Sequence, residues 1–379
     1  MGTISLPTEN GSIEEFSFEP GPGLASYTGE FTRVVYAAAH IVPDHLNPNE
    51  IDWEATLNYR KYLWSLNLGI AEAMDTAQRG SGLDWGLSRE LISRTLKASR
   101  EPGGGRVVCG CTTDQLSTEQ VHSFDEIIQA YQEQIGFVEG MSGTVVMMAS
   151  RTLARVGSTA DDYGKVYDCV LSGVKSPVII HWLGDMFDPA LKGYWGSTDF
   201  EAAMQVVLSI IERNPGKVDG VKISLLDKDK EIRMRKRLPD GVRMYTGDDF
   251  NYPELIRGDG SGYSDALLGI LDGIAPLASA ALGKLAEGDV EGYNQLLEPT
   301  VPLSRHIFTE PTAHYKTGLV FLAYLNGHQE HFQMVGGQES NRSIEHLAEI
   351  FRLAAGCGLL LDSDKAIQRM NAIIAKFST

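Results

Sequence analysis

The chain has 379 residues, a net charge of −17 at pH 7, and a composition that is 43% hydrophobic and 22% charged. This length suits one large α/β barrel or two ordinary domains. The negative charge argues against a nucleic-acid backbone as a partner, and no apolar run is long enough to span a bilayer. The chain starts without the basic and apolar parts of a secretory signal, and its four cysteines fit reduced thiols, so we expect a cytoplasmic protein.

Strand-like and helix-like patterns alternate along the chain after an irregular arm that ends at about residue 30. Apolar, β-branched runs bounded by turn signals predict buried strands, and apolar residues at helical spacing predict the helices between them. The strands are expected at 33–42, 68–74, 105–112, 143–149, 177–183, 218–226, 241–246 and 263–270. The helices are expected at 52–66, 88–100, 123–139, 159–171, 197–213, 228–237 and 252–256.

Eight strands, nearly all followed by a helix, predict a parallel sheet closed into a (β/α)8 TIM barrel. An open doubly wound sheet is the alternative, but no Gly-x-Gly-x-x-Gly follows the first strand. Beyond about residue 275 the pattern is purely helical. We therefore expect an N-terminal arm (1–30), a TIM barrel (31–275) and a C-terminal helical extension (276–379). The helices of the extension are expected at 276–287, 290–307, 313–327, 342–355 and 363–376.

Lys222 lies in the middle of the sixth predicted strand, Val-Asp-Gly-Val-Lys-Ile-Ser-Leu-Leu. Strand alternation puts Val221 and Ile223 on one face and Lys222 and Ser224 on the other, and the apolar face should meet the surrounding helices. Lys222 should therefore point into the barrel. Desolvation favours the neutral amine, which can attack a carbonyl carbon. The alternative interpretations are a lysine that extends to solvent at a strand end, or one that is salt-bridged to a neighbouring carboxylate.

Polar residues also stand at the carboxyl ends of other strands, where barrels carry their chemistry. His181, on the fifth strand, is the best-placed general acid or base, although periodicity leaves its direction open; it could equally hydrogen-bond a loop carbonyl. The aromatic residues Trp182, Tyr194 and Trp195 could line a sugar site or simply pack. A second hypothesis is a divalent metal site, although its carboxylates lack diagnostic spacing. Its ligands would be His40, Glu72, His181 and Asp185.

Several short motifs, in order along residues 33–327, resemble the dihydrodipicolinate synthase and N-acetylneuraminate lyase family. Gly220-Val-Lys222-Ile-Ser resembles its imine-forming strand, Pro177-Val-Ile-Ile-His181 its fifth strand, and Thr246-Gly247-Asp248-Asp249 its seventh-strand motif. The resemblance implies the barrel with a helical appendage and an imine between Lys222 and a small carbonyl substrate. It also implies chemistry without a cofactor, and a homodimer or homotetramer.

The chain departs from this family at two places. Met74-Asp75-Thr76-Ala77-Gln78 replaces the loop that grips a 2-keto acid, and His181 replaces a tyrosine. We therefore expect a sugar-derived carbonyl compound rather than pyruvate, with Lys222 as nucleophile and His181 as acid or base of a class I lyase or aldolase. A metal-dependent sugar lyase or isomerase and a non-catalytic sugar-binding barrel are the alternatives. The substrate-binding residues are expected to be Glu72, Asp75, Thr76, Asp185, Ser224, Thr246 and Asp248.

Overall fold

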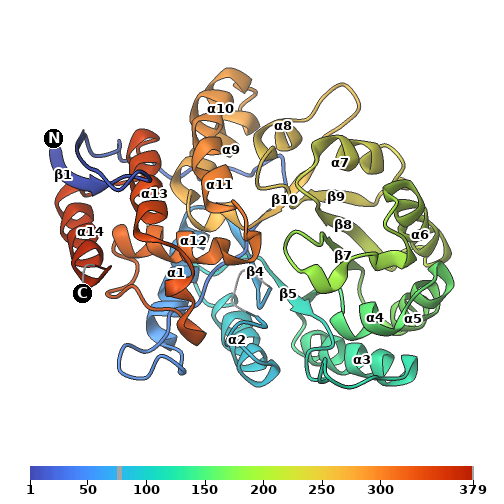
Figure 1. Ribbon diagram of the computed structural model, residues 1–379. Helices are drawn as coiled ribbons and strands as arrows, with labels where there is room; N and C mark the ends of the chain where they lie inside the picture. The colour runs from blue at the N-terminus through green and yellow to red at the C-terminus, as the bar shows by residue number, and fades with distance from the viewer. Residues whose placement is uncertain (75–78, 378–379) are drawn as a thin grey trace.

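The computed structural model describes residues 1–74 and 79–377, and its centre is a closed barrel of eight parallel strands (Figure 1). The strands follow the order β10-β3-β4-β5-β6-β7-β8-β9 around the barrel, which confirms the predicted fold. Each strand lies inside its predicted range but is shorter, because the flanking residues continue as loops. The strands are β3 Val35–Ala37, β4 Gly69–Glu72, β5 Val107–Cys111, β6 Thr144–Met147, β7 Val178–Leu183, β8 Val218–Ser224, β9 Arg243–Thr246 and β10 Asp265–Leu268.

Helices surround the barrel, and most begin at a residue whose side chain accepts a hydrogen bond from a backbone N–H of the first turn. Ser123 and Thr159 form complete capping boxes at two of these helices. The short helix α4, which begins directly after Ser150, was not predicted. The helices are α1 Trp53–Ser65, α2 Trp85–Ala98, α3 Phe124–Gly140, α4 Arg151–Val156, α5 Ala160–Gly173, α6 Phe200–Arg213, α7 Lys228–Arg235 and α8 Tyr252–Arg257.

Alternation along the strands separates the barrel interior from the layer beneath the helices. Ile179 and Tyr245 belong to a small interior cluster, whereas Val221 and Ile223 belong to the large cluster between the strands and the helices. Lys222 therefore faces the interior, as predicted. Since Ile179 is inside, His181 two residues later is on the interior face as well, which settles the direction that periodicity left open.

The C-terminal extension shares one hydrophobic core with the outer face of β3, β4 and β10. Every residue of α12 is buried, and most of its apolar residues belong to that core. The single helix predicted at 290–307 is divided into α10 and α11, because Pro299 and Pro302 interrupt it. No helix in the described part of the chain is long and apolar enough to cross a membrane. The extension comprises α9 Ala275–Ala286, α10 Val290–Leu297, α11 Val301–Ile307, α12 Tyr315–Leu325, α13 Ile344–Gly356 and α14 Ser363–Phe377.

The first half of the N-terminal arm forms an antiparallel hairpin of β1 (Gly2–Pro7) and β2 (Ile13–Phe18), where an irregular segment was predicted. Ile4 and Leu6 are buried, whereas Thr3 and Ser5, which alternate with them along β1, are exposed. β1 packs on α13 and α14, so both termini lie on the same side of the molecule (Figure 1). The hairpin depends on these distant helices, which explains why local sequence did not reveal it.

Candidate functional site

Lys222 lies near the middle of β8 and is 5% exposed. In the sheet register it stands opposite His181 on β7 and opposite Tyr245 on β9. The Tyr245 hydroxyl donates a 2.6 Å hydrogen bond to Asp219 near the start of β8, so this ring extends toward the amino-terminal end of the barrel. Burial raises the pKa of Tyr245, so its phenol stays neutral. The lysine is therefore flanked by an imidazole on one side and by a neutral aromatic ring on the other.

Gly247 leaves space for the Lys222 side chain. A Cβ at this glycine would lie 2.9 Å from Lys222 Cε and 2.1 Å from Ser224 Oγ. Both distances are shorter than real Cβ contacts, and the Ile223 carbonyl oxygen would be only 2.7 Å away, so any larger residue at position 247 would displace the lysine, the serine or the β8 backbone. The glycine in the Thr-Gly-Asp-Asp motif thus has a direct steric role beside the amine.

His181 and Ser224 form a hydrogen-bonding pair beside the lysine. His181 Nε2 lies 3.2 Å from Ser224 Oγ, and both side chains are buried on the interior face. A hydroxyl and an imidazole in contact can pass a proton between them near neutral pH. The structure therefore brings three of the predicted site residues together: Lys222, His181 and Ser224.

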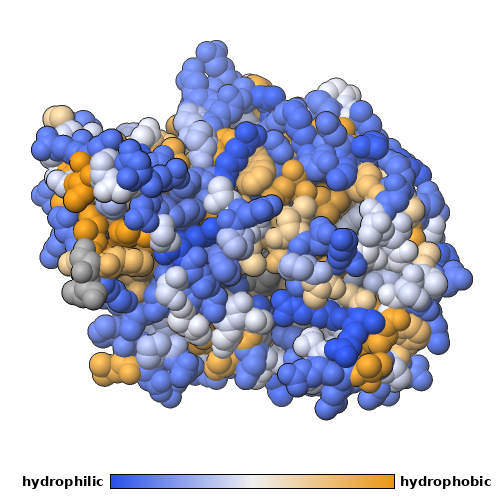
Figure 2. Space-filling view, viewed as in Figure 1, coloured by the Kyte–Doolittle hydropathy of each residue, from blue (hydrophilic) through white to orange (hydrophobic). Residues whose placement is uncertain are grey.

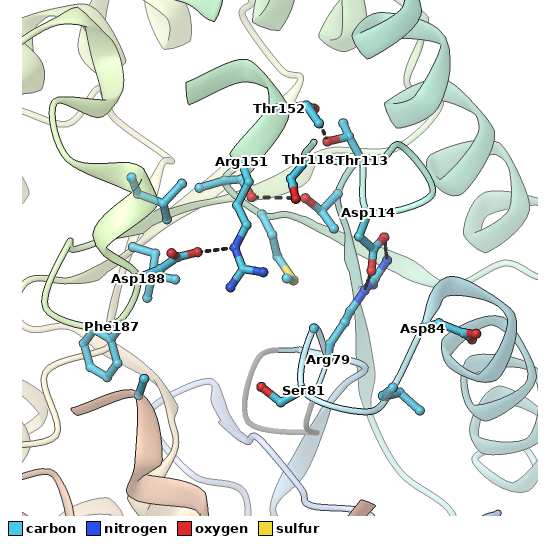
Figure 3. Close-up of a pocket in the computed structure, with 18 of the residues that line it drawn as sticks. Arg79, Ser81, Asp84, Thr113, Asp114, Thr118, Arg151, Thr152, Phe187 and Asp188 are labelled. Atoms are coloured by element: carbon cyan, nitrogen blue, oxygen red, sulfur yellow. Dashed lines mark hydrogen bonds and ion pairs between the residues drawn. The ribbon is translucent and has the colours of Figure 1, made fainter. Parts of the chain in front are cut away.

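A cavity of about 590 Å³ opens at the carboxyl ends of β5, β6 and β7 (Figure 3). Seen from outside, the middle of this face of the molecule is apolar and its border is largely hydrophilic (Figure 2). Lys222 and His181 do not line the cavity themselves. The two regions meet at Leu183, which pairs with Ser224 in the sheet, and at Met148, which belongs to the interior cluster of Ile179.

The cavity is lined by charged and hydroxyl side chains that are not among the predicted catalytic or substrate-binding residues. Arg79, which follows β4, and Arg151, which begins α4, extend into it (Figure 3). The C-terminal extension contributes Tyr315 and Lys316, both buried. Arg151 directly follows the fourth strand, so its position was a usable signal. Lys316 is distant in sequence from every strand, so only tertiary structure reveals its place.

Glu72 was predicted to bind substrate or a metal ion, but its side chain points away from the barrel interior. Its carboxylate accepts two 2.9 Å hydrogen bonds from Arg60 on α1 and one of 2.7 Å from Thr95 on α2. Ala71 takes the interior position on β4, so the next residue faces the helices. Arg60 and Glu72 are fully buried and form a structural ion pair.

Thr246 and Asp248 are also turned away from Lys222. Thr246 donates a 2.9 Å hydrogen bond to Glu231 on α7, which lies outside β9. Asp248 accepts hydrogen bonds from the backbone N–H groups of Phe250 and Asn251, and so holds the turn into α8. Both were predicted to bind substrate, and both instead anchor the end of β9.

Asp185 is exposed on the loop after β7. Asp75 and Thr76 lie outside the described residues. His40 Nδ1 is 2.8 Å from Asp272, and both side chains of this pair are buried. Within residues 1–74 and 79–377 no three His, Cys, Asp or Glu side chains come close enough to hold a metal ion, so the predicted ligand set is not assembled there.

The aromatic residues of the fifth strand and its loop pack rather than line the cavity. Trp182, Tyr194 and Trp195 belong to the hydrophobic cluster between the strands and the helices. The Trp195 ring lies 4.7 Å from the Tyr167 ring and 6.1 Å from the Trp182 ring, measured between centroids. The packing interpretation of these residues is therefore the correct one.

The fold is that of solved dihydrodipicolinate synthases, which confirms the resemblance at the level of the fold. The enzyme from Aquifex aeolicus matches with a TM-score of 0.66 at 13% identity, covering 87% of this chain and 99% of that one. The enzyme from Thermotoga maritima matches with a TM-score of 0.64 at 15% identity, covering 87% and 100%. The enzyme from Oceanobacillus iheyensis matches with a TM-score of 0.62 at 15% identity, covering 85% of this chain and 95% of that one.

These structures show the fold class of the chain, a dihydrodipicolinate synthase-like TIM barrel. Within it, the chain belongs to the family described as "Protein of unknown function (DUF993)", whose model matches residues 4–377. No curated protein sequence matches the chain. The family model therefore spans barrel, hairpin and extension together.

Replacing Glu72 by Gln should destabilise the fold, because it leaves the buried Arg60 guanidinium without its charge partner. We expect the free energy of unfolding to fall by about 3–5 kcal/mol in urea denaturation. Glu90→Gln, which breaks the exposed pair with Arg94, is the control and should cost about 0–1 kcal/mol. Equal losses in the two variants would contradict a structural role for Glu72.

Glu231 should make stability depend on pH. Burial raises the pKa of this carboxyl from 4.5 to about 8, although Ser264 and Thr246 donate hydrogen bonds to it. The folded state keeps a proton that the unfolded state releases, so wild-type stability should fall as pH rises from about 4.5 to 8. Glu231→Gln should lose this part of the slope in denaturation at several pH values. The exposed control Glu54→Gln should keep it, and identical slopes in all three proteins would refute the assignment.

Proposed function

We propose that the protein is a class I lyase or aldolase that forms an imine between Lys222 and a small carbonyl substrate. The observation that supports this most is the position of Lys222, 5% exposed on the interior face of the sixth barrel strand. His181 and Ser224 lie beside it, and a cavity opens at the carboxyl end of the adjoining strand. The fold shared with dihydrodipicolinate synthases is consistent with this chemistry.

In the proposed reaction the neutral amine of Lys222 attacks the carbonyl carbon. A C–N bond forms, and the carbonyl oxygen leaves as water after two proton transfers. The protonated imine then accepts the electron pair of a neighbouring C–C or C–H bond, and hydrolysis returns the free lysine. In this proposal His181, which contacts Ser224, delivers and removes the protons. The electron sink is the imine itself, so the proposal requires no cofactor.

A sugar-derived carbonyl compound fits the cavity better than pyruvate does. The volume of about 590 Å³ exceeds what a three-carbon acid would fill. Hydroxyl groups are frequent in the lining, and they can hydrogen-bond a polyhydroxylated chain. A homodimer or homotetramer and a cytoplasmic location stay predictions. The hydroxyl-bearing residues of the lining are Ser81, Thr112, Thr113, Ser117, Thr118, Thr152 and Tyr315.

Borohydride reduction in the presence of candidate carbonyl compounds tests the imine. Pyruvate, glyceraldehyde, dihydroxyacetone and 2-keto-3-deoxy sugar acids form a suitable panel. With a substrate, the intact mass should rise by the mass of the compound minus water plus two hydrogens, and Lys222→Ala should give no adduct. Lys217→Ala is the matched control, because Lys217 precedes the same strand and bonds the Val174 carbonyl instead. An adduct that survives in Lys222→Ala would contradict the proposal.

Gly247→Ala should impair imine formation. The added methyl group would lie 2.9 Å from Lys222 Cε and 2.7 Å from the Ile223 carbonyl oxygen, so the lysine and the adjoining β8 backbone must shift. A displacement on the order of 1 Å should slow adduct formation about 100-fold. Gly136→Ala, on an exposed position of α3 with open space around it, should leave the rate unchanged. An unaltered rate in Gly247→Ala would show that this steric fit does not matter.

A further inference from the structure

Two arginines enter the cavity, and their hydrogen bonds distinguish them. Arg79 is fully committed to the protein. Its guanidinium donates two 2.7 Å hydrogen bonds to Asp114, one of 2.6 Å to Gln134, and further ones to the carbonyls of Ala73 and Gly110. Arg79 therefore holds the loops after β4 and β5 together and has little capacity left for a ligand.

Arg151 is held at one nitrogen only. Its Nε donates a 2.5 Å hydrogen bond to Asp188, and the side chain is half exposed. Neither terminal nitrogen donates a hydrogen bond to any residue of the described chain. The guanidinium extends into the cavity across Gly80, with Nη1 3.3 Å from where a Cβ would stand (Figure 3). Asp188 thus orients the planar group, while its two outer nitrogens remain available to a ligand.

The carboxylates of the described lining leave the outer nitrogens of Arg151 open to an anion. Asp114 is paired with Arg79, and Asp188 is held by Arg151 Nε. The other two carboxylates of the lining, Asp84 and Glu119, are exposed at its rim. None of these four carboxylates accepts a hydrogen bond from a terminal nitrogen of Arg151.

We propose that the substrate carries a carboxylate or phosphate at the end remote from its carbonyl, and that Arg151 binds this group. A guanidinium with two outer nitrogens matches the oxygens of either group in a bidentate arrangement. Arg151 follows β6, Lys222 lies on β8, and the cavity of Arg151 meets the interior around Lys222 at Leu183 and Met148. The anionic group and the reacting carbonyl therefore stand at opposite ends of the substrate. That the other end of the substrate is a carbonyl group that reacts with Lys222 rests on the proposed function.

Paired aldehydes that differ in charge test the inference. Glyceraldehyde is compared with glyceraldehyde 3-phosphate, and 4-hydroxybutanal with succinic semialdehyde, by the concentration that gives half-maximal borohydride-fixed adduct. We expect at least one anionic probe to need about tenfold less than its neutral partner, and Arg151→Gln to abolish this preference. Arg213→Gln is the matched control, since Arg213 pairs through Nε with Asp168 and is 48% exposed on α6. The two pairs distinguish phosphate from carboxylate.

Calorimetric titration of inorganic phosphate and succinate into Lys222→Ala provides a measurement that needs no imine. Arg151-dependent binding of either anion, without adducts from any aldehyde, would support the anion site and refute the imine. The anion site is overturned if neither anion binds and no charge preference is found. It is also overturned if the preference or the binding survives in Arg151→Gln.

Discussion

The central constraint in this structure is a lysine amine kept inside a closed ring of strands. Removing an ammonium from water is expensive, so the interior must fit this side chain closely. Gly247 provides room for its Cε, the Tyr245 ring lies on the neighbouring strand, and His181 in contact with Ser224 lies on the other side. These features support Lys222 as the centre of the proposed chemistry.

At the carboxyl end of the barrel, the face of the strand on which a polar side chain stands separates the residues of the proposed site from those with a structural role. Lys222 and Ser224 were predicted to face inward, because the apolar residues that alternate with them, Val221 and Ile223, mark the outer face of β8. The direction of His181 could not be predicted, since β7 is apolar on both faces. The prediction that Glu72 belongs to the site was wrong. Its partner Arg60 belongs to a helix, and nothing in the local sequence reveals that pair.

The order of strands and helices was predictable because each barrel unit has its own periodicity and turn signals. Features that depend on distant contacts were not. The hairpin of β1 and β2 is stabilised by α13 and α14, and Lys316 reaches the cavity from the C-terminal extension. The extension thus contributes to the wall of the candidate site as well as to the core, and the site is assembled from barrel loops and extension together.

The most direct test of the central claim is to map the reduced adduct by peptide mass spectrometry. The account predicts that a substrate fixed by borohydride is found on the peptide that contains Lys222, with Lys316 and the surface lysines unmodified. A modification on another lysine at equal or higher yield, or turnover of a carbonyl substrate without any fixed adduct, would contradict it.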